Sequence, residues 1–341
     1  MKRIPLYLVP LVAISLFTHL AISQKVGSTS MQFLKVMPCA RATAMGDAYS
    51  VLASGAEAVF WNPAGLAQIE ENEVSLTYLT WIFDTRQVAA AFAKSLGSAG
   101  AAGLQVQYID FGEIEEALWS SPYRDDVTYP GLTGRTFRPY AILVGLSYAK
   151  QLTEKFSTGL TVKYAHESLY NGEMVNAVQS TGDSDNVKTW ANGLMFDLGI
   201  WYDTGFRSIR LGASVQNFGA DVNYARESNP VPLSLRVGIA ADLVGTNALL
   251  ASSENSRVVV AFDLFQPNDY TQQAHAGVEY EFDGIVAFRA GYKFNYDADG
   301  LTAGVGVNQT LSGIHLSVDY SYGSLAYNLG SVQRISIGAG F

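Results

Sequence analysis

Hydrophobic and polar side chains alternate with a period of two from Glu73 to the last residue. In segment 314–322, every second residue is aliphatic or aromatic, and the residues between them are His, Ser, Asp and Ser. This period predicts β-strands that have one apolar and one polar face. About fourteen such strands are expected, near 73–83, 86–95, 101–111, 138–151, 156–168, 190–202, 207–218, 232–242, 257–265, 273–282, 285–296, 301–310, 313–322 and 332–341.

The period of two leaves two fold classes open, because a soluble β-sandwich produces the same alternation. Aromatic residues at strand ends favour a membrane barrel, in which they lie at the two interfaces; examples are Tyr140, Tyr148, Tyr320 and Tyr322. The final segment, 335–341, also alternates and ends on Phe341, similar to the last strand of outer-membrane barrels.

Charged residues in the middle of strands separate the two fold classes further. They lie on the face opposite the apolar one, where a sandwich core would exclude them but a polar lumen accepts them. These residues are Lys163, Asp197, Arg210, Arg236, Asp263, Glu279, Arg289 and Asp319. The predicted fold class is therefore all-β, a transmembrane antiparallel β-barrel of about 14 strands over residues 71–341.

The predicted connections alternate between short and long. Tight connections, such as the one at Asp283-Gly284, contrast with long ones at 112–137, 169–189 and 219–231. In outer-membrane barrels, short turns face the periplasm and long loops face the exterior. We therefore expect the three long loops on the outer surface.

Segment 39–68 differs from everything after it. Small residues dominate, and its apolar residues recur at partly helical spacings, which predicts short helices. Asn62 precedes Pro63, and this pair is typical of a helix N-cap followed by position N1. The many alanines and glycines allow close approach to surrounding walls, so residues 24–70 are predicted to form a packed insert.

The first 23 residues carry the features of a secretory signal peptide. Lys2 and Arg3 form a basic start, an apolar core follows, and Ala21 and Ser23 provide small residues before Gln24. A transmembrane anchor is the alternative, but it needs about 20 continuous apolar residues. Cleavage after Ser23 would change the formal net charge from −9 to −11, because Lys2 and Arg3 are lost.

Two stretches of the N-terminal segment together carry a family resemblance. Ala-Arg-Ala-Thr-Ala-Met-Gly-Asp-Ala at 40–48 and Phe-Trp-Asn-Pro-Ala-Gly-Leu-Ala at 60–67, followed by amphipathic strands, resemble the PorV/PorQ family among the FadL-like outer-membrane barrels. The resemblance implies that the segment is a hatch inside the barrel. It also implies a role in type IX secretion, in which the barrel receives exported proteins and passes them to the surface attachment machinery.

The resemblance and the residues define the candidate sites. The hatch site comprises Arg41, Gly46, Asp47, Trp61, Asn62, Pro63 and Gly65. Arg41 and Asp47 either form a polar latch against wall charges such as Arg210 or Arg236, or are simply solvated in a wet lumen. Loop 112–137 is acidic and aromatic and is expected to be a cargo-docking surface or a lid; its anchors are Trp119, Tyr123 and Tyr129.

The sequence contains few motifs that are typical of catalysis or of metal and cofactor binding. We find no His-Glu-x-x-His motif, no Gly-x-Ser-x-Gly motif and no cysteine cluster, and so expect no catalytic residue, no metal site and no cofactor. The acidic balance argues against nucleic acid as a partner. Expected partners are outer-membrane lipid with secretion machinery and cargo proteins, or alternatively hydrophobic small molecules taken up passively as in FadL-like barrels.

Overall fold

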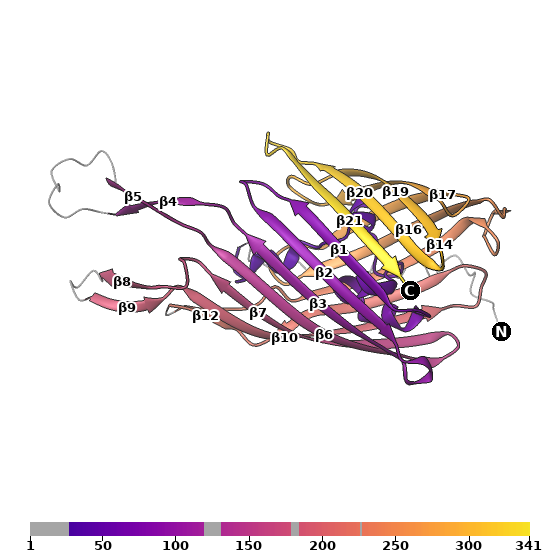
Figure 1. Cartoon of the computed structure of the whole chain (residues 1–341), viewed down its shortest axis with the longest axis horizontal. Helices are drawn as coiled ribbons and strands as arrows, with labels where there is room; N and C mark the ends of the chain where they lie inside the picture. Colours follow the sequence, from indigo (N-terminus) through magenta and orange to yellow (C-terminus); the bar gives the residue numbers. More distant parts are fainter. Residues whose placement is uncertain (1–26, 119–130, 179–183, 226) are drawn as a thin grey trace, which may run out of the picture.

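The computed structural model describes residues 27–118, 131–178, 184–225 and 227–341. Fourteen long antiparallel strands follow one another around a closed wall, and β1 pairs with both β2 and β21 (Figure 1). The strands are β1 (Glu73–Thr80), β2 (Arg86–Ser95), β3 (Ala101–Asp110), β6 (Tyr140–Thr153), β7 (Phe156–Ser168), β10 (Trp190–Asp203), β11 (Arg210–Gly219), β14 (Ser234–Gly245), β16 (Ser256–Pro267), β17 (Gln273–Phe282), β18 (Val286–Phe294), β19 (Leu301–Leu311), β20 (Ile314–Ser324) and β21 (Ser331–Gly340). The predicted all-β barrel is confirmed, and the strand bounds agree with the prediction to within three residues.

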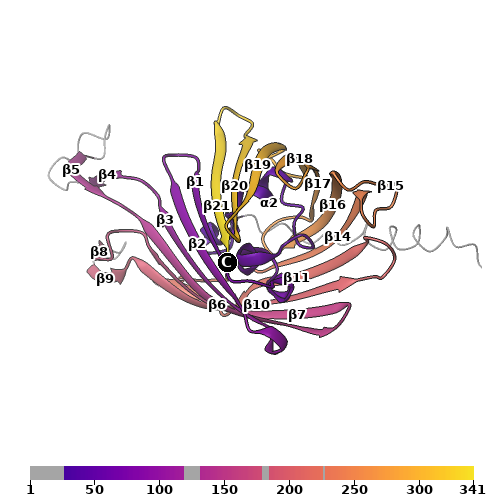
Figure 2. The same ribbon diagram turned by 45° about the vertical axis from the view of Figure 1, so that its right-hand side comes forward.

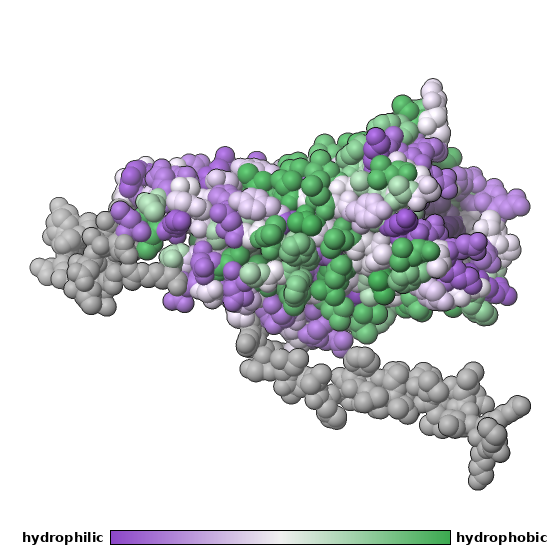
Figure 3. Space-filling model, turned by 90° about the horizontal axis from the view of Figure 1, so that it is seen from below, coloured by the Kyte–Doolittle hydropathy of each residue, from purple (hydrophilic) through white to green (hydrophobic). Residues whose placement is uncertain are grey.

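The outer face of the wall is apolar because the strands point alternate side chains outward. Leu76, Leu146 and Ile337 are each about half exposed or more. Figure 3 shows the result as a band of hydrophobic side chains across the middle of the visible face, with hydrophilic ones at both ends. Among the residues that the structure describes, no helix is long and apolar enough to span a membrane.

The two ends of the barrel differ in the length of their connections. At one end the turns are tight, and at Asp283-Gly284 both residues have positive φ, as a type I′ hairpin requires. At the other end three small hairpins extend the wall, and two of them project furthest in Figure 1. They are β4 (Ile114–Leu118) with β5 (Gly131–Phe137), β8 (Met174–Val178) with β9 (Ser184–Lys188), and β12 (Val222–Tyr224) with β13 (Glu227–Asn229). We call these the short-turn end and the long-loop end.

One further strand pair lies at the short-turn end. There, β15 (Ala251–Ser252) pairs in parallel with the end of β14. One short 3₁₀ helix, η4 (Gly97–Ala99), lies in the turn between β2 and β3. These additions lie outside the lumen and leave the closure of the wall unchanged.

The N-terminal segment lies inside the barrel as short helices (Figure 2). They are η1 (Gln32–Lys35), α2 (Ala40–Ala44), η2 (Gly55–Glu57), α3 (Ala58–Trp61) and η3 (Pro63–Gln68). Thr29 donates a hydrogen bond to Asp269 at the long-loop end, and Asn72 pairs with the backbone of Phe341 at the short-turn end. We call residues 27–72 the hatch. The predicted signal peptide, 1–23, lies outside the described residues.

The hatch fills the lumen with two apolar clusters. Met31, Phe33 and Leu34 pack against wall residues such as Leu143 and Met195 in the long-loop half. The larger cluster surrounds Trp61, which is fully buried, and includes many alanines of both hatch and wall. Small side chains dominate because the hatch backbone lies almost directly on the wall.

Candidate functional site

An ion network joins the helix α2 to strands β17, β18 and β20. The Arg41 guanidinium donates to both carboxylate oxygens of Glu279, at 2.9 and 2.7 Å. Arg289 donates to the same carboxylate at 2.6 Å and to Asp319 at 2.6 Å. Glu279 has no exposed surface. One fully buried carboxylate therefore balances a hatch cation and a wall cation.

A second ion pair fixes the turn that follows α2. The Asp47 carboxylate lies 2.8 Å from the Lys293 ammonium, and Arg236 donates to the Asp47 backbone carbonyl at 3.2 Å. Burial raises the pKa of the Asp47 carboxyl, but the positive charge of Lys293, with His275 and Arg236, outweighs burial and lowers this pKa to about 2. The pair is therefore fully ionised at neutral pH.

The structure places the wall partners of the latch residues differently from the sequence-based expectation. Arg236 contacts Asp47 only through the backbone carbonyl, and the carboxylate pairs with Lys293. Arg210 pairs instead with Asp242 on the neighbouring strand, at 3.0 Å. Arg210 begins β11, near the short-turn end, which explains why it does not reach Asp47.

Hydrogen bonds attach the remainder of the α2 region to the wall. Asp263 on β16 accepts the backbone N–H groups of Tyr49 and Ser50 and the Ser50 hydroxyl, at 3.1, 2.9 and 2.8 Å. The Thr43 and Ser321 hydroxyls lie 2.8 Å apart. These contacts use strands on the same side of the barrel as the two ion networks.

Glycines of the wall lie beneath the hatch backbone. Gly46 has a φ of +65°, and a Cβ built on Gly291 would lie 2.1 Å from the Gly46 nitrogen. On the opposite wall, a Cβ on Gly159 would lie 2.4 Å from the Pro63 carbonyl carbon. Gly65 is close to the hatch itself, because its Cβ would lie 1.9 Å from the Ala53 carbonyl oxygen. The predicted close approach of this segment thus requires glycine on both surfaces.

Asn62 connects three parts of the molecule. Its side-chain oxygen accepts the Ala64 N–H at 3.1 Å, which caps η3 with Pro63 at position N1. Its amide group donates to the carbonyls of Ser50 and Ile200, at 2.8 and 3.0 Å. The residue is fully buried. Asn62 is therefore a helix cap and also a crosslink between the hatch and β10.

We predict that Asn62→Ala destabilises the hatch by about 3 kcal/mol. The lost cap contributes about 1 kcal/mol, and each of the two other hydrogen bonds contributes about 1 kcal/mol. Heat-modifiable gel migration and protease digestion of the purified barrel measure the effect. Gln68→Ala, at the exposed end of the same helix, is the control and should change stability little. Equal effects of the two variants would contradict the assigned role of Asn62.

Trp61 adjoins both the cap and the Asp47 region. Its ring makes an edge contact with Tyr49, with centroids 5.7 Å apart, and the Arg236 guanidinium lies 5.0 Å from the ring centroid. The same guanidinium lies 4.2 Å from the ring centroid of Phe265. Cation–π contacts of a desolvated guanidinium are stabilising, so the apolar centre of the hatch and its ionic edge are linked.

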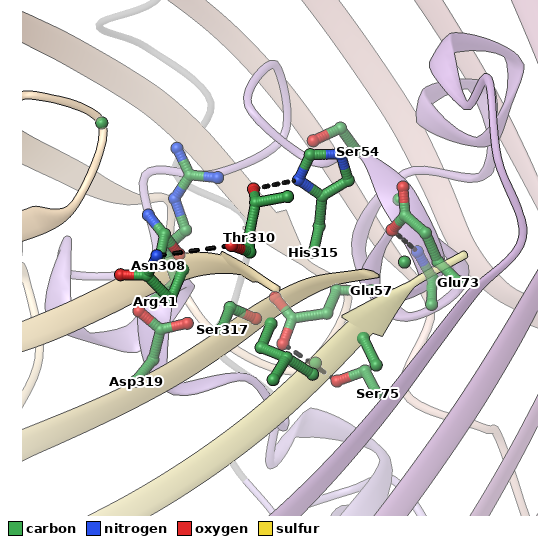
Figure 4. A pocket seen from close by; sticks show the side chains of 18 of the residues that line it. Arg41, Ser54, Glu57, Glu73, Ser75, Asn308, Thr310, His315, Ser317 and Asp319 are labelled. Atoms are coloured by element: carbon green, nitrogen blue, oxygen red, sulfur yellow. Dashed lines mark hydrogen bonds between the residues drawn. The ribbon is translucent and has the colours of Figure 1, made fainter. Parts of the chain in front are cut away.

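A polar cavity of about 730 Å³ opens at the short-turn end, between the hatch and strands β1, β17, β18, β19, β20 and β21. Its lining includes Arg41, Glu57, Glu70, Glu71, Glu73, Ser75, Glu281, Asp283, Arg289, Asn308, Thr310, His315, Ser317 and Asp319. Figure 4 shows Arg41 beside Asp319 at one end and Glu73 at the other. Burial and the nearby Asp319 raise the pKa of Glu57 to about 7.

Glu57 and Lys293 are among the site residues that sequence reasoning missed. Glu57 lies among small hatch residues, where nothing in the sequence distinguishes a cavity-facing carboxyl from a solvated one. Lys293 lies two and four residues from Gly291 and Arg289, so its inward orientation follows from the period of two. The alternation of inward and outward side chains along the strand was therefore enough to indicate the orientation of Lys293. The docking residues Trp119, Tyr123 and Tyr129 lie outside the described residues.

The long-loop hairpins are tied together at their bases. Arg135 on β5 donates to Glu116 on β4 at 2.9 and 3.1 Å, and the Tyr170 hydroxyl donates to the same carboxylate. Tyr170 also packs against Phe137, with ring centroids 4.9 Å apart. The base of loop 112–137 is thus connected to the start of the next long loop.

Comparisons with known proteins agree on the architecture. Solved structures that match include the Pseudomonas putida toluene transporter TodX, at 15% identity and a TM-score of 0.55, covering 88% of this chain and 95% of that one. The Ralstonia pickettii toluene transporter TbuX matches at 15% identity and a TM-score of 0.53, covering 88% and 96%. A Pseudomonas aeruginosa FadL homologue matches at 10% identity and a TM-score of 0.50, covering 89% and 98%. At these identities the likeness establishes a FadL-like barrel fold.

The family is identified by the match of the sequence to a family model. No curated protein sequence matches the chain. Within the described residues, no group of three or more His, Cys, Asp or Glu side chains is arranged to hold a metal ion. The family model described as "Type IX secretion system protein PorV" matches residues 20–263, which is well over half of the chain. The protein is thus a barrel of the bacterial outer membrane, and it belongs to the PorV family of type IX secretion proteins.

Proposed function

We propose that this barrel binds secreted cargo proteins and passes them to surface attachment in type IX secretion, without catalysis. The observation that supports this proposal best is the attachment of the hatch to opposite walls. Arg41 and Asp47 bind β17 and β18, whereas Asn62 binds β10. A plug held in this way leaves the outer surfaces of the barrel as its means of acting on a partner.

The energetic cost of removing the hatch supports a static plug. Separating one partner from a buried ion pair costs about 3–5 kcal/mol, because the other charge stays buried and unpaired. Displacement of α2 would break the Arg41–Glu279 and Asp47–Lys293 pairs together. A passive channel would have to break these ion pairs each time it opened, whereas a docking protein keeps them intact.

The proposed partners follow from the surfaces. Lipid covers the apolar band, and cargo or attachment proteins meet the long-loop end, which faces the exterior. Loop 112–137, with Trp119, Tyr123 and Tyr129, is the proposed docking surface. At its base, Glu116 is bound by both Arg135 and Tyr170. These contacts orient the base of the loop before a partner arrives, which favours docking because less conformational entropy is then lost on binding.

Passive uptake of hydrophobic small molecules is the second candidate. The apolar cluster in the long-loop half favours it, because Leu143 and Met195 would line a greasy chamber if Met31 and Phe33 moved away. Hydrophobic ligands bind in pockets of this kind. In this alternative the hatch is a gate that has to move.

A disulfide between hatch and wall separates the two candidates. Thr43→Cys with Ser321→Cys, in a Cys39→Ala background, replaces two hydroxyls that lie 2.8 Å apart on α2 and β20. We predict that oxidation leaves surface display of secreted proteins unchanged, because cargo transfer does not use the lumen. Display is measured by surface labelling before and after reduction of the crosslink.

Two other results of the crosslinking experiment would change this conclusion. Loss of display on oxidation, restored by reduction, would show that cargo transfer needs hatch movement. Reversible loss of hydrophobic compound uptake, with display unchanged, would support the channel alternative. The single variant Thr43→Cys, in the same background, controls for the loss of the hydroxyl contact.

A further inference from the structure

The cavity opens at the short-turn end, which faces the periplasm. It is bounded by the hatch and by the first and last strands of the wall. Helix η2 forms one side, β1 and β21 form the seam next to it, and β19 and β20 form the opposite side. At about 730 Å³ the cavity falls within the range of about 300–1,000 Å³ that is typical of ligand pockets. Its size suits a few residues of an extended peptide.

Carboxylates of the cavity are held in fixed positions. The Glu73 carboxylate accepts the Ala56 N–H at 3.0 Å, and a Cβ on Gly55 would lie 2.0 Å from its oxygen. Glu57 accepts the Ser75 hydroxyl at 3.2 Å. Gly55, with a φ of +65°, is thus the residue that allows Glu73 to close over the hatch. Both groups are oriented before any ligand arrives.

The cavity lacks cations to match these carboxylates. Among the described lining residues, seven carboxyl side chains face two arginines, a formal charge of −5 with His315 neutral. Both arginines are already bound, because Arg41 and Arg289 donate to Glu279, and Arg289 also donates to Asp319. Glu57 and Glu73 therefore have hydrogen bonds but no ion-pair partner among the described residues.

We propose that this cavity is a binding site for a lysine- or arginine-bearing peptide segment of a periplasmic protein. Glu57 and Glu73 are the principal contacts, and Asn308, Thr310 and Ser317 offer polar atoms to the peptide backbone. Charge complementarity carries this assignment: oriented, uncompensated carboxylates in a concave site bind ammonium or guanidinium groups through charge-assisted hydrogen bonds. The site lies at the opposite end from the proposed cargo-docking loop, so it serves a different partner.

The proposed binding depends on pH through Glu57. The charges acting on this carboxyl come from Asp319 on β20 and from Arg41 on α2, and its other neighbours are Ser75 on β1 and Cys39. With its pKa raised to about 7, Glu57 is half protonated at neutral pH. A cation binds the ionised form, so binding should be about tenfold tighter at about pH 8 than at about pH 6. The Glu57→Gln variant should lose this dependence on pH, because its amide does not ionise.

The experiment uses the full-length protein in lipid nanodiscs and fluorescent tetralysine as the probe. Fluorescence anisotropy at low ionic strength should detect binding, and Glu57→Gln with Glu73→Gln should weaken it by about tenfold or more. Glu154→Gln is the matched control, because Glu154 is an exposed acid in the β6–β7 turn, at the same end but outside the cavity lining. Heat-modifiable migration establishes that each variant is folded.

Several results would overturn the proposal. They are no binding of tetralysine, equal loss in the Glu154→Gln control, or affinity unchanged in the double variant. Spermidine binding as tightly as tetralysine would contradict a peptide ligand and indicate a small polyamine site. This assay is independent of secretion, so its failure leaves the proposed role in cargo transfer unaffected, and the reverse also holds.

Discussion

Glu279→Gln is expected to release α2 from the wall while leaving the barrel closed. The neutral amide leaves the buried Arg289 and the partly buried Arg41 without the Glu279 carboxylate, and Asp319 is then the remaining carboxylate of the network. Breaking a buried pair from one side typically costs about 3–5 kcal/mol. We expect a loss of hatch stability of this size, which is the largest effect of any charge substitution considered for the lumen.

Limited proteolysis in detergent, followed by mass spectrometry of the fragments, measures this release. Cleavage should begin within 39–52 in the variant and be absent there in the parent protein. Glu281→Gln provides the control, because Glu281 lies two residues further along the same strand and makes no ion pair among the described residues. Identical digestion of the Glu279 variant and the parent would mean that the network does not hold the hatch.

Gly291→Ala should displace the same part of the hatch by adding a single methyl group. The new Cβ would lie 2.1 Å from the Gly46 nitrogen and 2.1 Å from the Met45 carbonyl carbon. Neither backbone atom can rotate away as a flexible side chain would. Overpacking costs about 1–3 kcal/mol in ordinary cores, and we expect the upper end here because Asp47 would also move away from Lys293.

Gly323→Ala is the matched control for this methyl group. Gly323 also lies on a barrel strand, and its new Cβ would meet only the Thr302 methyl at 3.6 Å, an ordinary van der Waals contact. Thermal conversion of the folded band on gels and proteolysis within 39–52 report on both variants. Unchanged behaviour of Gly291→Ala would show that the wall yields at this point, and that the close packing has no role in holding the hatch.

The strands were predictable because each one carries its own signal. A period of two over ten residues, as in β18 or β20, requires no knowledge of the rest of the chain. The Asn62-Pro63 cap is equally local, because the capped Ala64 N–H lies two residues away. The second role of Asn62, its bond to Ile200, spans 138 residues and has no local signal.

The ion partners were not predictable, for a physical reason. The period of two gives the face on which a residue lies but not its height along the barrel axis. Arg210 and Arg236 both point inward, yet only Arg236 lies level with Asp47. Height depends on the register of every intervening strand pair, and a slip of two residues preserves each face while changing every partner.

The contacts of the hatch also set the order of assembly. Arg41 and Glu279 are separated by 238 residues, and Ala40 and Ser336 by 296. The β1–β21 seam joins the first strand to the last. Neither the plug nor the seam can therefore reach its final contacts before almost the whole chain has been made. Such non-local pairing makes folding slow and leaves strand edges exposed for longer. During its passage to the membrane the nascent protein thus depends on being kept apart from other chains, and its earliest residues are among the last to gain their final structure.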